Sequence, residues 1–106
     1  MSKILVVDDE RSIRNTFEIF LTREGHEVFL AEDASNALKI FDEKYPDLVI
    51  TDIVMPKITG IDLLSQIKTK APEVPIIIMT GEPTVDTAQD AVKNGANDYL
   101  IKPVPK

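Results

Sequence analysis

Two hydrophobic patterns alternate along this chain. Short apolar runs bounded by turn residues are typical of strands buried on both faces of a parallel sheet, whereas apolar residues spaced three or four apart are typical of amphipathic helices. The first pattern predicts five strands, at 3–7, 26–31, 47–51, 74–79 and 99–101, with four helices between them. The residues expected on the apolar helix faces are Ile13, Phe17, Phe20 and Leu21, then Ala34, Ala37, Leu38 and Phe41, then Ile61, Leu63, Leu64 and Ile67, and last Val85, Ala88, Ala91 and Val92.

Turn residues and caps set the helix ends. The first helix is expected over 11–24, with Gly25 as its C-terminal cap. The second is capped at its start by Asp33 or Ser35 and ends before Pro46, because the residue before a proline disfavours helical backbone. Strands that alternate with helices in this way predict an α/β fold with a parallel sheet and right-handed crossovers.

Composition narrows the classes of function. The 106 residues, 43% hydrophobic and 28% charged, predict one globular domain over 1–106. No apolar run approaches the ~20 residues of a membrane span, no signal peptide opens the chain, and the lack of cysteine excludes disulfide and thiolate chemistry. A net charge of -6 argues against binding to a nucleic-acid backbone, which requires a basic surface. We therefore expect a cytoplasmic protein that binds neither a membrane nor nucleic acid directly.

Polar residues gather where the predicted strands end. Asp52 follows the apolar run 48–50, and Pro56 and Gly60 keep the next residues non-helical, which disfavours a mere helix cap. Open α/β sheets bind ligands at the carboxyl ends of their strands, so residues at those ends should converge. They are Asp8, Asp9, Glu10, Asp52, Thr80 and Lys102.

The clustered acids require a counter-charge. Two carboxylates ~4 Å apart repel by about 4 kcal/mol at an effective dielectric near 20. The cluster must therefore bind a cation or raise a pKa. Oxygen ligands without His or Cys favour a hard ion: magnesium, manganese or calcium.

Each of these residues also has a structural interpretation. Asp8 and Asp9 could cap the first helix, Thr80 could be a loop hydroxyl, and Lys102 a solvated surface lysine. Tyr99 could be plain core. His26 is expected to be a surface turn residue without a role in the acid cluster.

Taken together, the motifs resemble the receiver domain of two-component response regulators. The resemblance rests on Asp8-Asp9, on Asp52 with Met55-Pro56 and Gly60, on Thr80, and on Lys102-Pro103, in order and spacing over the whole chain. It implies a flavodoxin-like, doubly wound five-stranded sheet of order 2-1-3-4-5. The run 80–88 also resembles receivers of enhancer-binding transcription activators of the nitrogen-regulatory type.

The resemblance implies a function for these residues. Asp52 would accept a phosphoryl group from a sensor histidine kinase in a magnesium-dependent reaction, with manganese as an alternative ion. Asp9 would bind the metal directly, Asp8 largely through water, and Asp52 and the backbone carbonyl of Val54 would complete the protein ligands. Thr80 and Lys102 would contact the phosphoryl oxygens, with Lys102-Pro103 as a cis peptide.

The same resemblance implies a switch and partners. Thr80 and Tyr99 would transmit phosphorylation to the surface of the fourth helix and fifth strand, and so control an output domain or partner in transcription regulation. The domain would be a phosphoacceptor that assists its own phosphorylation and dephosphorylation, not an enzyme. A dimer through that surface, or through the flank described next, is left open.

Three departures from the family pattern matter. Thr59 replaces the usual Asp or Asn before the loop glycine, and Glu82 near Thr80 could tune dephosphorylation. The chain stops at Lys106, without the family's fifth helix, which suggests a fragment of a longer protein. One flank of the sheet, beside the first helix, should then be uncovered, and exposed apolar area predicts a partner or a swapped helix.

The sequence disfavours three other functions. A flavodoxin-like nucleotide or flavin binder is disfavoured because Asp8-Asp9-Glu10 would repel a phosphate after the first strand. A pseudo-receiver that only binds partners is disfavoured by the intact acid set with Thr80 and Lys102. A metal-dependent phosphatase would need a second acid at Val54.

Overall fold

The computed structural model describes residues 2–53, 59–81 and 83–101. Within these ranges five strands alternate with four helices, so the predicted elements are confirmed, with bounds shifted by at most two residues. The elements are β1 (Lys3–Val7), α1 (Arg11–Arg23), β2 (Glu27–Ala31), α2 (Ala34–Lys44), β3 (Leu48–Asp52), α3 (Gly60–Lys70), β4 (Ile76–Thr80), α4 (Val85–Lys93) and β5 (Asp98–Ile101).

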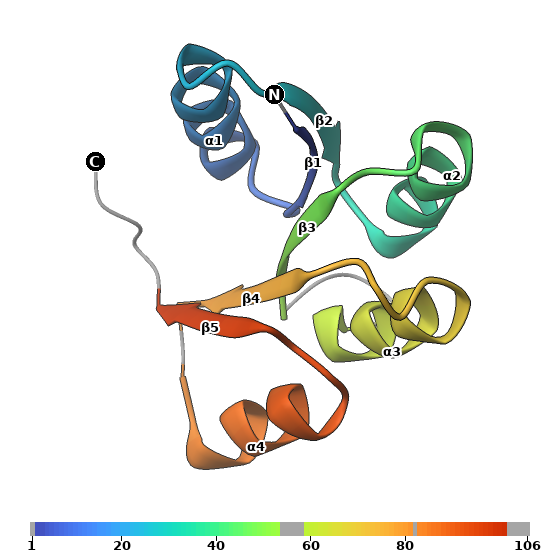
Figure 1. The fold of residues 1–106 in the computed structure, drawn as a ribbon. Coiled ribbons are helices and arrows are strands. Elements are labelled where there is room, and N and C mark those ends of the chain that lie inside the picture. The colour runs from blue at the N-terminus through green and yellow to red at the C-terminus, as the bar shows by residue number, and fades with distance from the viewer. Residues whose placement is uncertain (1, 54–58, 82, 102–106) are drawn as a thin grey trace.

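The strands form one parallel sheet in the order β2-β1-β3-β4-β5, as predicted. The chain steps outward from β1 to β2, then crosses back over β1 to β3 and continues in the opposite direction (Figure 1). The order of the strands therefore reverses between β1 and β3, and ligands of doubly wound sheets bind beside that point. Both strands carry acidic residues at their carboxyl ends.

Helices cover the two faces of the sheet unequally. On one face α2, α3 and α4 pack on the sheet, and on the other α1 does (Figure 1). The first face holds a large buried cluster that includes Leu5, Phe41, Leu63, Leu64 and Ile78. The second holds a small one, made of Ile4, Val6, Ile50 and Met79, against which half-buried α1 residues pack.

Three predicted core positions are wrong. Phe20 of α1 is 59% exposed, because it lies at the outer edge of the stripe of Ile13, Phe17 and Leu21 that contacts the sheet. Val85 and Val92 of α4 are each 72% exposed. Of the predicted apolar face of this nine-residue helix, only Ala91 is fully buried, since only a narrow stripe of it contacts the sheet.

The predicted helix ends are largely confirmed. Gly25 has φ +89°, the left-handed conformation of a C-terminal cap, and Asp33 rather than Ser35 caps α2 by accepting a hydrogen bond from the Asn36 amide. His26 is half-buried just before β2, and its Nδ1 accepts a hydrogen bond from the Ser2 amide at 3.2 Å. In the described part of the chain, no helix has the length and apolar character needed to cross a membrane.

Candidate functional site: an acid pocket at the strand ends

The register of the sheet brings the predicted acids together. Val7 of β1 pairs with Thr51 of β3, so the next residues, Asp8 and Asp52, lie level on neighbouring strands. Parallel strands are ~4.8 Å apart, which places the two residues side by side. Thr80 ends β4, the other neighbour of β3. We call Asp8, Asp9, Glu10 and Asp52 the acid pocket.

The pocket combines buried and exposed carboxylates. Asp8 is 0% exposed and Asp52 is 4% exposed, whereas Asp9 and Glu10 are exposed. Asp8, Asp9 and Glu10 each offer a carboxylate oxygen, and these three oxygens lie within 4.8 Å of one another. Burying carboxylates is costly unless a cation or hydrogen bonds compensate them, so this arrangement favours a cation near Asp8 and Asp9.

Hydrogen bonds with β2, with the N-cap residue of α1 and with α1 itself hold Asp8. Its amide donates to the Ala31 carbonyl of β2 at 3.0 Å, and its Oδ1 accepts the Glu10 amide at 2.8 Å. Arg14 Nη1 of α1 donates to the Asp8 carbonyl oxygen at 2.7 Å. Arg14 belongs to no motif recognisable in the sequence; only its spacing from Asp8 across the start of a helix could have suggested it.

Gly60 lies against the backbone of Asp52. Its amide donates to the Ile53 carbonyl at 2.8 Å, and a Cβ at position 60 would lie 1.9 Å from the Asp52 carbonyl oxygen. Any other residue would therefore displace the start of α3 from the phosphoacceptor candidate. Thr59, one of the departures from the family pattern, caps α3 through a capping box with Asp62.

Thr80 and Tyr99 occupy neighbouring strands, and Tyr99 pairs with Ile78, two residues before Thr80. Thr80 is buried, and Tyr99 of β5 is half-buried. The Tyr99 hydroxyl lies 2.8 Å from Thr87 Oγ1 of α4, and Thr87 also forms the capping box of that helix with Thr84. Thr87 thus connects Tyr99 with the start of α4. The sequence pattern did not point to this contact; the available signal was the position of Thr87 three residues after the N-cap Thr84.

Four predicted features lie outside the described residues. They are the Val54 carbonyl ligand, Glu82, the Lys102 ammonium and the Lys102-Pro103 cis peptide. The described donors are oxygen atoms of carboxylates. This set fits a hard divalent ion such as magnesium, so the cluster of Asp8, Asp9 and Glu10 could hold one.

Known proteins match the chain over nearly all of its length. A family model described as response regulator receiver domain matches residues 4–106. The transcriptional regulatory protein ZraR of Klebsiella oxytoca is 46% identical over 101 residues, 95% of this chain and 23% of that protein. The DNA-binding transcriptional regulator NtrC of Proteus hauseri is 43% identical over 100 residues, 94% of this chain and 21% of that protein.

A solved structure agrees with the fold. The crystal structure of a response regulator receiver domain protein from Clostridium thermocellum has a TM-score of 0.93 and 43% identity, and the match covers 99% of this chain and 85% of that one. The chain spans less than a quarter of the length of the two regulators above. What it shares with them is therefore one domain of a longer protein.

Proposed function

Because this chain belongs to the response regulator receiver domain family, we propose that Asp52 accepts a phosphoryl group from a sensor histidine kinase in a magnesium-dependent reaction. One observation supports this most. Asp52 is buried at the carboxyl end of β3, level with Asp8 and next to the point where the strand order reverses. A carboxylate in that position is costly for stability, which favours a chemical role over a structural one.

The proposed transfer needs only the residue types at this edge. An Asp52 carboxylate oxygen attacks phosphorus, the bond from phosphorus to the histidine nitrogen breaks, and its electron pair stays on the imidazole. A carboxylate is already a nucleophile and requires no general base. Phosphoryl transfer then depends on positioning and on neutralising spread-out negative charge.

The other proposed residues neutralise or orient the phosphoryl group. A divalent ion bound by Asp8, Asp9, Asp52 and the Val54 carbonyl would offset the repulsion between Asp52 and the incoming phosphoryl oxygens. Asp9 is exposed and so faces the solution from which that ion arrives, whereas Asp8 is buried behind it. Thr80 and Lys102 are proposed to contact phosphoryl oxygens. Gly81, exposed after Thr80, leaves the approach to Asp52 free of side chains.

The switch is proposed to run from Thr80 to α4. If the Thr80 hydroxyl moves toward a phosphoryl oxygen, it leaves space that the Tyr99 side chain can enter. Inward movement of Tyr99 would break its hydrogen bond to Thr87, and with it one of the contacts at the start of α4. Phosphorylation shifts this equilibrium only by its differential affinity for the two arrangements. A coupling of ~1–3 kcal/mol would change partner affinity by roughly 5- to 150-fold.

The partners follow from this role. We propose a sensor histidine kinase as phosphoryl donor and an output domain, or a separate protein that regulates transcription, as the recipient of the signal, in the cytoplasm. The domain itself is proposed to act on no second substrate. It would speed only its own phosphorylation and dephosphorylation.

Intact mass after incubation with acetyl phosphate or phosphoramidate tests this proposal. With magnesium the chain should gain one phosphoryl group, and Asp52→Asn should abolish the gain. Asp90→Asn, which removes an exposed carboxylate on α4, is the control and should be labelled like wild type. A label that persists on Asp52→Asn would assign the acceptor elsewhere. No label on wild type would favour a receiver fold that only binds partners.

A further inference from the structure

Arg14 links α1 to the loop that carries the metal-ligand candidates. It lies one turn into α1 and is half-buried. Its amide donates to the Glu10 carbonyl at 3.2 Å, as in any helix, but its side chain turns back and donates from Nη1 to the Asp8 carbonyl oxygen at 2.7 Å. A short, charge-assisted bond of this kind fixes its acceptor more firmly than a neutral one does.

The bond acts on the peptide unit that joins Asp8 and Asp9. The Asp8 amide and Oδ1 are already bonded to Ala31 and Glu10. Arg14 holds the remaining backbone group of Asp8, its carbonyl. Since a peptide unit is planar, fixing its carbonyl also fixes the direction of the Asp9 amide and the position of the Asp9 Cα, from which the side chain starts.

The start of α1 lacks a side-chain cap. Glu10 is the N-cap residue, and its side chain makes no capping hydrogen bond. The first turn also contains no acidic residue that could interact favourably with the positive end of the helix dipole. α3 and α4, by contrast, begin with complete capping boxes.

We propose that Arg14 is a positioning residue: it orients the side chains that bind the divalent ion and does not contact the ion itself. By holding the Asp8 carbonyl, it keeps the Asp8 and Asp9 carboxylates directed toward one point and lowers the entropy lost on metal binding. This inference rests on the proposed magnesium-dependent function. Groups that orient metal ligands from behind typically account for 10- to 100-fold in metal affinity.

If Arg14 acted only through its charge, removing it would change the magnesium affinity in the opposite direction. A guanidinium near the pocket repels a divalent cation, so removing its charge alone would tighten magnesium binding. Arg11 provides the matched control, because it carries the same charge on the first turn of the same helix. Its side chain is exposed and makes no bond to Asp8 within the described residues.

Magnesium titrations of wild type, Arg14→Gln, Arg14→Lys and Arg11→Gln, followed by the amide shifts of residues 8–10, test the proposal. We expect the Kd to rise about tenfold in Arg14→Gln, and less in Arg14→Lys because an ammonium keeps the charge but lacks the planar fork. In Arg11→Gln the Kd should stay unchanged or fall. Amide exchange at Asp9 and Glu10 without metal should be faster in Arg14→Gln than in Arg11→Gln.

The outcomes separate this inference from the function on which it rests. An Arg14→Gln Kd equal to or below that of wild type overturns the role of Arg14 and leaves the magnesium site in place. A wild type that binds no magnesium overturns both. If Arg14→Gln does not fold, the Arg14→Lys variant decides: an unchanged Kd overturns the proposal, and a Kd raised several-fold supports it.

Discussion

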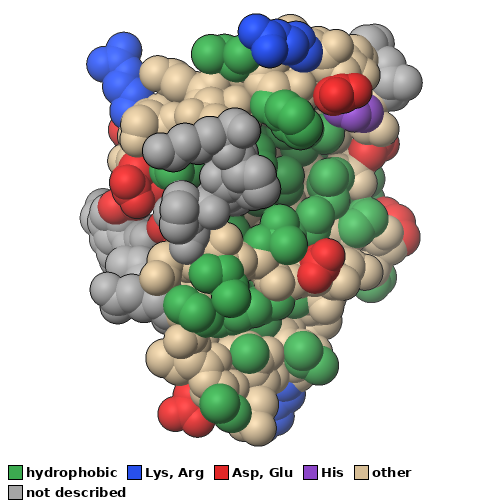
Figure 2. Space-filling view, turned by 90° about the vertical axis from the view of Figure 1, so that its left-hand side faces the viewer, with side chains coloured by type: hydrophobic (Ala, Val, Ile, Leu, Met, Phe, Trp, Pro, Cys, Tyr) green, Lys and Arg blue, Asp and Glu red, His purple; other side chains and the backbone are tan. Residues whose placement is uncertain are grey.

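The two faces of the sheet differ in how completely they are covered. On the face of α2, α3 and α4, side chains from these three helices and from β1 to β4 contribute to one continuous buried cluster, against which the half-buried Tyr99 of β5 packs. On the face of α1, the fully buried side chains come from the strands alone, and none of the residues of α1 is fully buried. Figure 2 shows hydrophobic side chains gathered at the surface on the side where α1 and the end of β5 lie.

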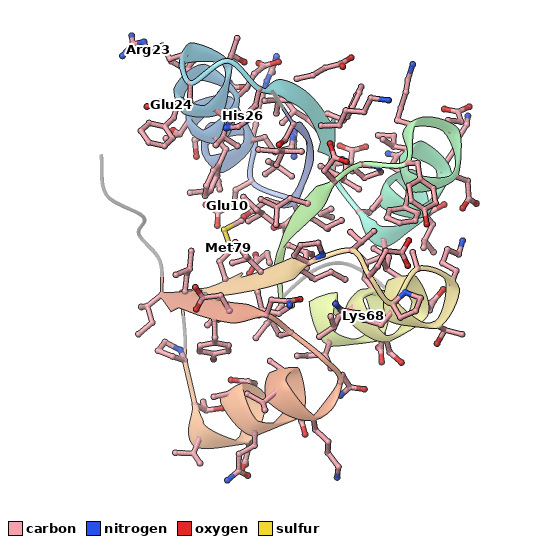
Figure 3. The ribbon with its side chains drawn as sticks, in the orientation of Figure 1. Glu10, Arg23, Glu24, His26, Lys68 and Met79 are labelled. Atoms are coloured by element: carbon pink, nitrogen blue, oxygen red, sulfur yellow. The ribbon has the colours of Figure 1, made fainter. Side chains whose placement is uncertain are left out.

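The exposed apolar residues on the α1 side include Phe20 of α1 and Leu100 of β5, which pairs with Met79 of the cluster on that face. Among the described residues they leave apolar area exposed beside α1, and the uncovered flank stays a prediction. The labelled side chains of Glu10, Arg23, Glu24 and His26 come from α1 or the loops at its two ends (Figure 3). The difference between the faces shows that the sheet is stabilised mainly from one side, while Asp8 and Asp52 lie at the edge that both faces share.

The largest expected effect compares a phenylalanine on each face. Phe41→Ala, in the large cluster, should lower the free energy of unfolding by about 3–5 kcal/mol, because it removes a side chain that is fully buried. Phe17→Ala on α1 should cost roughly 1–2 kcal/mol, since that side chain is only half-buried. Urea unfolding measures both, and equal losses would show that the two faces contribute alike.

A smaller loss of unfolding free energy is expected at α4, which packs on the well-covered face but fully buries only Ala91. Thr87→Val removes the hydroxyl that bonds Tyr99 and the capping box, and should cost about 1 kcal/mol. Its control is Thr16→Val, whose hydroxyl bonds only the Ser12 carbonyl in the described residues. Hydrogen exchange should accelerate in 84–93 for the first variant only. Unchanged exchange there would separate Tyr99 from the stability of α4.

Phe20 should matter little for stability despite its size. Phe20→Gln should change the free energy of unfolding by less than about 0.5 kcal/mol, because the side chain is already exposed. It should nevertheless reduce binding of a hydrophobic dye to the folded chain. A loss as large as that of Phe17→Ala would mean that the flank is better covered in solution than the structure shows.

The smallest effect concerns pH. On the well-covered side, the Tyr45 hydroxyl donates to Glu73 Oε2 at 2.6 Å, and this bond lowers the pKa of Glu73 and raises the pKa of Tyr45. Because the folded pKa of Glu73 is lowered, its contribution is present above the ordinary value of 4.5 and is lost as pH falls below it. Because the folded pKa of Tyr45 is raised, its contribution is lost as pH rises above 10.0.

Tyr45→Phe should therefore flatten the pH dependence of the melting temperature slightly at both extremes, and Glu73→Gln should do so at the acid end. Thermal scans across the pH range measure it. Identical profiles for wild type and both variants would show that the bond does not persist in solution.

The local pattern of apolar residues was enough to predict the secondary structure of this protein. Apolar runs and helical spacing predicted each strand and helix because burial periodicity is a property of consecutive residues. The placement of Asp8, Asp52 and Thr80 at one edge followed as well, since parallel strands end together. The strand order was known in advance only through the resemblance to receiver domains.

Tertiary structure decided what lies between elements. A helical pattern cannot tell which flank of its apolar stripe a neighbour will cover, so Phe20, Val85 and Val92 were predicted as buried and are exposed. The bond of Arg14 to Asp8 and that of Thr87 to Tyr99 join separate elements. Their partners are chosen by packing and register, because a flexible polar side chain carries no periodic signal of where it will bond.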